Sequence, residues 1–131
     1  MAESPVKELR FVLVADDYDT AVAFWRDTLG LPVVMQWDED HGSGAVLDAG
    51  RATVEVLSRR EAEFVDQVEV GRAAAGPRVA MEVDDSATMA ERFVSAGAAE
   101  RLGAPVETPW GDRNVRLRTP GGLQLTLFTV R

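Results

Sequence analysis

Charged and polar side chains that could bind a ligand recur within four otherwise apolar stretches, as Arg10, Glu55, Arg78 and Thr126. In a β-strand alternate residues share a face, so each stretch should turn its polar side chains to the same side. A guanidinium can fork onto a carboxylate, phosphate or carbonyl group of a ligand. The alternative is that Arg10 pairs with Glu55, and Arg78 with Glu82, only to hold the strands in register, or that these side chains point to solvent.

Aromatic side chains accompany this polar set. Trp37 is followed by the acidic run 38–40, and an aromatic ring beside carboxylates suits a cationic or planar ligand. The alternative is a solvated hairpin tip. Trp110 and Arg113 belong to a short turn-forming segment near the C-terminus, and Phe128 shares the strand face of Thr126. We expect these three side chains to line the site, although Trp110 and Phe128 could equally serve local packing.

Several kinds of chemistry are excluded or disfavoured by what the chain lacks. The sequence has no cysteine, which excludes disulfides, thiolate zinc sites and cysteine nucleophiles. His41 is the single histidine, so neither a metal site nor a Ser-His-Asp triad is expected around it. No glycine-rich phosphate loop is present.

Two sets of elements must position these residues. In the first half we expect a strand around residues 9–14, a helix from Thr20 to Leu29, and strands at about 33–38, 44–49 and 52–58. The second half is expected to contain a strand at Val79–Asp84, a helix from Ser86 to Ala96, and strands near 104–109, 113–119 and 122–130. Asp16-Asp17 should end the first strand and cap the first helix.

The two halves also match each other in sequence. At an offset of 68, Arg10 aligns with Arg78, Asp16-Asp17 with Asp84-Asp85, and Thr20 with Thr88. We therefore predict a single α+β domain over residues 1–131, built from two βαβββ modules at about 6–58 and 78–131. Residues 59–77 read as a linker with a short helical run.

This arrangement resembles the vicinal oxygen chelate superfamily, which includes glyoxalase I, extradiol dioxygenases and bleomycin-resistance proteins. The segment from Asp17 to Trp25, followed by Leu29-Gly30-Leu31, is similar to the family's D-x-x-x-S-x-x-F-Y … L-G-L signature. The tail from Thr119 to Leu125 is similar to its D-P-D-G-x-x-I motif, but has Thr119 and Gly121 where Asp is usual. The resemblance covers nearly the whole chain.

The resemblance implies that the two modules form cupped mixed sheets. It also implies a divalent metal held by the first and last strand of each module. Carried onto this sequence, the four ligand positions fall at Arg10, Glu55, Arg78 and Thr126. Only Glu55 is an ordinary metal ligand, because a guanidinium has no free lone pair. We therefore expect no metal and no cofactor, and a protein closest in character to the antibiotic-binding branch. The resemblance also implies that Trp110 is a ligand-stacking aromatic at the rim of the site.

The amino-acid composition and net charge limit the kinds of partner that the protein is expected to bind. The formal net charge is −8, and residues 1–66 carry fourteen acidic and six basic side chains. Nucleic acid is an unfavourable partner for such a chain. No stretch approaches a membrane span, and no signal-peptide pattern opens the chain. We expect a cytoplasmic small-molecule binder that acts by sequestration and assembles as a homodimer. The alternatives are a metal-dependent glyoxalase-type lyase, isomerase or dioxygenase, and an interaction module without a ligand.

Overall fold

The computed structural model describes residues 3–74, 76–120 and 122–131. Ala75 of the expected linker and Gly121 of the expected C-terminal turn lie outside the described residues, as do residues 1 and 2. The first half contains β1 (Glu8–Ala15), α1 (Tyr18–Ala23), the π-helical turn η1 (Phe24–Thr28), β2 (Val33–Glu39), β3 (Gly42–Asp48) and β4 (Thr53–Ser58). Helix α2 (Arg59–Glu69) follows. The second half contains β5 (Arg78–Glu82), α3 (Ser86–Ser95), β6 (Glu100–Arg101), β7 (Val106–Glu107), β8 (Arg113–Arg118) and β9 (Gln124–Thr129).

The described strands form one mixed sheet of nine strands, in the order β2-β3-β4-β1-β5-β9-β8-β6, with β7 also paired to β8. Strand β1 is parallel to β4, and β5 is parallel to β9. The two halves join where β1 runs antiparallel to β5. The predicted α+β class is therefore confirmed.

Asp17 caps the first helix as the sequence predicts, and α3 begins at Ser86 as expected, but the first helix begins at Tyr18 and not at Thr20, and other elements also differ in length from those expected. Asp17 accepts from the backbone N–H of Thr20 at 3.1 Å, and Asp85 caps α3 in the same way at Thr88. The first helix changes after Ala23 into a π-helical turn, in which Leu29 N–H donates to Phe24 C=O, five residues back. The strand expected near 104–109 is shortened to Val106–Glu107.

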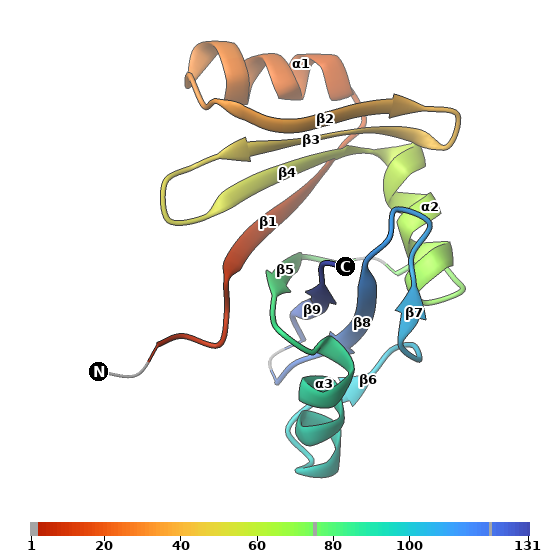
Figure 1. The fold of residues 1–131 in the computed structure, drawn as a ribbon. Helices are drawn as coiled ribbons and strands as arrows, with labels where there is room; N and C mark the ends of the chain where they lie inside the picture. The colour runs from red at the N-terminus through yellow and green to blue at the C-terminus, as the bar shows by residue number, and fades with distance from the viewer. Residues whose placement is uncertain (1–2, 75, 121) are drawn as a thin grey trace.

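The two faces of the sheet differ in what they pack against (Figure 1). Helices α1 and α3 cover one face, the outer face, each over an apolar cluster of its own half. Helix α2 lies on the opposite, inner face, where its acidic side chains contact polar residues of β8 and β9. None of the helices in the described chain has the length and apolar character needed to cross a membrane.

Candidate functional site

Four central strands bring the predicted polar residues together on the inner face. Glu55 and Arg78 flank Val12 from the two neighbouring strands, and Arg10 and Thr126 flank Ala80. Strand alternation had predicted this grouping, and it follows from the registers. The structure nevertheless divides the set between two environments.

Helix α2 occupies one end of the inner face through a buried ion network. Asp66 Oδ1 lies 2.5 Å from Arg78 Nη1 and 2.9 Å from Arg116 Nη1. Arg116 is 1% exposed and also donates to Glu69, at 2.7 and 3.0 Å. Asn114 and Thr126 donate to the same Glu69 carboxylate. Arg78 and Thr126 are therefore held by α2, and the expected pair of Arg78 with Glu82 is not formed.

The other end of the inner face holds what we call the Arg10 cluster: Glu8, Arg10, Glu55, Glu82 and Phe128. Arg10 Nη2 donates to Glu8 Oε1 at 3.0 Å, and the guanidinium lies 4.9 Å from the centre of the Phe128 ring. The expected pair of Arg10 with Glu55 is replaced by this contact with Glu8, which lies on the same strand. Arg10 Nε is buried without a hydrogen-bond partner among the described residues.

Two carboxyl groups near Arg10, those of Glu55 and Asp112, have raised pKa values. Burial raises the pKa of Glu55 to about 7, against the opposing attraction of Arg10. The nearby acids Glu69 and Glu8 add to the rise, and Arg78 opposes it. Burial also raises the pKa of Asp112, which Arg10 again opposes. The side chains of Glu55 and Glu82 form no hydrogen bond or ion pair with the described residues. The cluster thus contains two carboxyl groups that have no hydrogen-bond donor or ion-pair partner among the described residues.

The hairpin aromatic Trp110 lies next to this cluster. The residue is 45% exposed, and its ring centre is 6.4 Å from that of Phe64 on α2. Its side chain also interacts with Asp112, close to Arg10. Trp110 is thus placed between α2 and the Arg10 cluster. Arg113 is not part of this group, because it lies on the outer face of β8, 3.7 Å from Glu107.

Trp37 is held in a different part of the inner face. Its indole lies against Gly44, where a Cβ atom would overlap the ring, so only glycine permits this approach. Trp37 Nε1 donates to Glu61 Oε2 at 3.1 Å. The partner of Trp37 is therefore a helix carboxylate and not the acidic run that follows it in sequence.

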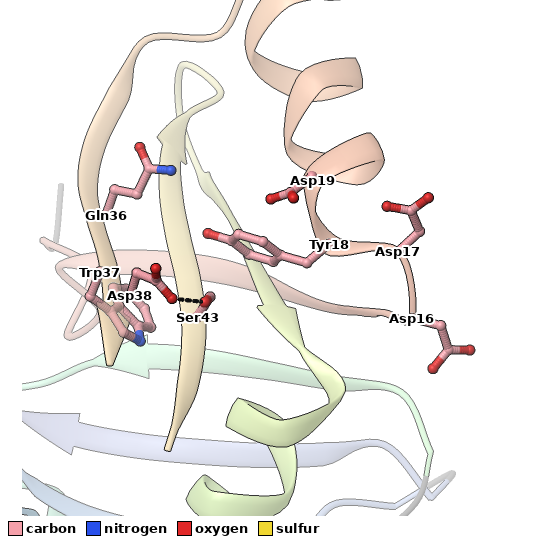
Figure 2. A pocket seen from close by; sticks show the side chains of 8 residues that line it. All are labelled: Asp16, Asp17, Tyr18, Asp19, Gln36, Trp37, Asp38 and Ser43. Atoms are coloured by element: carbon pink, nitrogen blue, oxygen red, sulfur yellow. Dashed lines mark hydrogen bonds between the residues drawn. The ribbon is translucent and has the colours of Figure 1, made fainter. Parts of the chain in front are cut away.

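A groove of about 710 Å³ opens between the start of α1 and strands β2 and β3 (Figure 2). Its lining includes four carboxylates, from Asp16, Asp17, Asp19 and Asp38. Three of them have internal partners: Asp16 binds Arg59, Asp17 caps α1, and Asp38 accepts from the Ser43 hydroxyl at 2.6 Å. Three of the four carboxylates of the groove are therefore already partnered within the protein.

The donor set does not fit the metal implied by the resemblance. Of the four positions, Arg10 and Arg78 carry guanidinium groups, and Arg78 is tied to Asp66 in the buried network. Thr126 donates to Glu69. Among the residues that the structure describes, no three His, Cys, Asp or Glu side chains are grouped so as to hold a metal ion.

Sequence reasoning missed the residues that complete both ends of the inner face. Asn114 and Arg116 alternate on β8 in the same period as Thr126 and Phe128, so the strand period could have identified them. Asp66 and Glu69 carried a weaker signal, because acidic side chains three residues apart on a helix usually face water. Glu8 precedes the first apolar alternation and gave no signal.

Comparisons with known proteins agree on the fold. A model of the Glyoxalase/Bleomycin resistance protein/Dioxygenase superfamily matches residues 9–127. The uncharacterized protein YraH of Bacillus subtilis is 36% identical over 63 residues, which span 47% of this chain and 48% of YraH. The chain therefore matches about half the length of that relative.

Two solved structures show the same architecture. Methylmalonyl-CoA epimerase from Mycobacterium tuberculosis superposes with a TM-score of 0.72 at 21% identity, covering 100% of this chain and 93% of that one. A variant of the Streptomyces coelicolor epimerase, in complex with 2-nitronate-propionyl-CoA, gives 0.69 at 20% identity, with 97% and 99% covered. At these identities the likeness concerns the fold alone. The family model spans most of the chain, and the chain belongs to the Glyoxalase/Bleomycin resistance protein/Dioxygenase superfamily.

Proposed function

We propose that this protein binds a small cationic or planar molecule at the Arg10 cluster and acts by sequestering it, without a bound metal. The observation that carries the proposal is the excess of carboxyls over cations. Of the acids of the cluster, only Glu8 contacts Arg10, and Glu55 and Glu82 form no hydrogen bond or ion pair with the described residues. The next cations, Lys7 and Arg78, pair instead with Asp84 and Asp66. A ligand cation would satisfy Glu55 and Glu82.

The aromatic side chains support the same ligand class. Phe128 is only 4% exposed and is covered by the Arg10 guanidinium, so the half-exposed Trp110 ring beside the cluster is the aromatic face that a ligand can reach. Aromatic faces attract cations, and they stack on planar rings. A planar cation would therefore find charge at the cluster and a stacking partner in Trp110.

Proflavine, a planar cation, is a suitable probe, with the planar anion fluorescein as its counterpart. We expect saturable binding of proflavine and none of fluorescein. The double variant Glu55→Gln/Glu82→Gln should bind proflavine about tenfold more weakly, since it loses two charge contacts. Asp38→Asn, which removes one carboxylate from the groove in Figure 2, is the matched control and should bind as wild type. Equal binding of both dyes would contradict selection of a cation by the carboxyls of the cluster, and a loss confined to Asp38→Asn would move the site to the groove.

A second candidate, proton-transfer catalysis, is favoured by Glu55 itself. A carboxyl with a pKa of about 7 is suited to accept and return a proton near neutrality. The two epimerases of similar fold make a racemising or isomerising enzyme the natural form of this candidate. Turnover of an acyl-CoA substrate that is lost in Glu55→Gln would favour catalysis over sequestration.

Metal analysis separates sequestration from the metal-dependent alternative. We expect the purified protein to contain no stoichiometric Ni²⁺, Zn²⁺, Mn²⁺ or Fe²⁺. About one divalent ion per chain, lost in Glu55→Gln, would overturn the proposal and favour a glyoxalase-type lyase, isomerase or dioxygenase.

We also propose that the protein works as a homodimer in the cytoplasm. Val33, Val34 and Met35 are exposed on the edge strand β2, and such an edge is open to pairing with a second copy. Light scattering at micromolar concentration should give the mass of two chains, and the mass of one chain would contradict the dimer.

A further inference from the structure

A carboxylate–imidazole pair lies outside the Arg10 cluster, at the turn between β2 and β3. His41 Nδ1 is 2.5 Å from Glu61 Oε1, and the side chain of Glu61 is only 4% exposed. The second oxygen of Glu61 accepts from Trp37 Nε1. Gly42 makes this possible, because its φ of 141° and its lack of a Cβ let the turn approach the backbone of Glu61. The pair is therefore fixed by its surroundings.

The hydrogen bond determines which ring nitrogen of His41 is free. Because an ionised carboxylate can only accept, the neutral imidazole carries its proton on Nδ1 and its lone pair on Nε2. The ring is held flat against Phe64, with centres 4.1 Å apart and planes 13° from parallel. The structure gives Nε2 no hydrogen-bond partner within the described segments, and the His41 side chain is 37% exposed. His41 thus offers an oriented proton acceptor.

A cavity of about 490 Å³ adjoins this acceptor, within the size range of small-molecule sites. Its lining is formed by His41, Arg60, Glu63, Phe64, Gln67 and Ala73. Phe64 and Ala73 supply apolar surface for a ring. Arg60, which also donates to the backbone carbonyl of Asp40, supplies a positive charge that would stabilise an anion formed beside it, against the opposing charge of Glu63 in the same lining.

We propose that this cavity binds a weakly acidic aromatic hydroxyl compound, a phenol, whose O–H is accepted by His41 Nε2. On binding, the phenol O–H bond breaks and its proton moves to Nε2. The imidazolium then donates from Nδ1 to Glu61 and from Nε2 to the phenolate, and no other bond changes. Glu61 acts as a positioning residue. This site is independent of the function proposed for the Arg10 cluster.

The probe is 4-nitrophenol in neutral buffer, where an imidazole can be neutral and part of the free phenol is un-ionised and lacks the visible band of its phenolate. With the wild type we expect saturable growth of that band. His41→Gln should bind at least about tenfold more weakly and abolish the growth of the band, since it removes the proton acceptor. Glu61→Gln should bind with a smaller growth of the band. Glu39→Gln, a nearby charge change outside the cavity, should behave as wild type.

Nitrogen NMR of the single histidine tests the positioning step without any mutation. In the same neutral buffer we expect the neutral ring to carry its lone pair on Nε2, and that nitrogen to shift to the protonated range when 4-nitrophenol is added. A lone pair on Nδ1, no saturable binding by the wild type, or equal binding by His41→Gln would each overturn the proposal.

Discussion

Glu55 stands out among the single residues because it is partly buried next to both Arg10 and Arg78 and yet bonds to neither. Its folded pKa of about 7 lies above the ordinary value of 4.5, so the folded protein binds a proton more readily than the unfolded chain does. The stabilising contribution of the protonated form is complete below pH 4.5 and is lost as the pH rises through 7. Ionised Glu55 therefore destabilises the fold at alkaline pH.

Glu55→Gln should raise the free energy of unfolding above neutral pH, by on the order of 1 kcal/mol because Glu55 retains contact with water. In acid the variant and the wild type should melt alike. Thermal melts across the pH range measure the difference. Glu100→Gln, an exposed acid on β6, is the matched control and should show no such pH dependence. Destabilisation by Glu55→Gln above neutral pH, where Glu55 is ionised, would instead reveal an ion pair between Glu55 and Arg10.

For single residues, the sequence correctly predicted the strand face on which each polar side chain lies, but it did not predict the ion-pair partners of those side chains. The period of two placed Arg10, Glu55, Arg78 and Thr126 on one face, because that period is a property of each strand alone. Partners depend on residues that the strand pattern does not identify. Arg78 pairs with Asp66 on a helix, and Arg10 pairs with Glu8 on its own strand. Alternation predicts the side to which a side chain points, but not what lies opposite it.

At the scale of elements, helix α2 makes the two ends of the inner face different, because it covers one end and leaves the Arg10 cluster at the other. Its buried residues include Glu61, Asp66 and Glu69, which is the reverse of an ordinary amphipathic helix. These acidic side chains can be buried because Arg78 and Arg116, on the strands that α2 packs against, form ion pairs with Asp66 and Glu69. A helix pattern read from sequence assigns such acids to solvent, and this is why residues 59–77 read as a linker.

Breaking the network under α2 should be costly. Arg116→Met should lower the free energy of unfolding by about 3–5 kcal/mol, because Asp66 and Glu69 would remain buried without their main partner. Arg118→Met, two residues along the same strand face but exposed, is the control and should change stability by less than about 0.5 kcal/mol. Denaturant unfolding followed by circular dichroism measures both. Similar stabilities of the two variants would mean that the network is solvated and does not anchor α2.

At the scale of the whole molecule, two connections join the halves. The first is the antiparallel pairing of β1 with β5. The second is α2, which contacts Trp37 and His41 of the first half through Glu61, and Arg78 and Arg116 of the second through Asp66 and Glu69. The internal repeat predicted two similar halves, but it could not show that the segment between them would bind both.

These two connections should make the protein unfold as one unit, despite its separate apolar clusters. Native-state hydrogen exchange measures this directly: amides of Ala45 and Leu47 in β3, and of Val115 and Leu127 in β8 and β9, should open with the same free energy. In Arg116→Met all four values should fall together, because the β1–β5 pairing still couples the halves. If the amides of β8 and β9 open at a lower free energy than those of β3, the halves are separate folding units and the α2 contacts add little coupling.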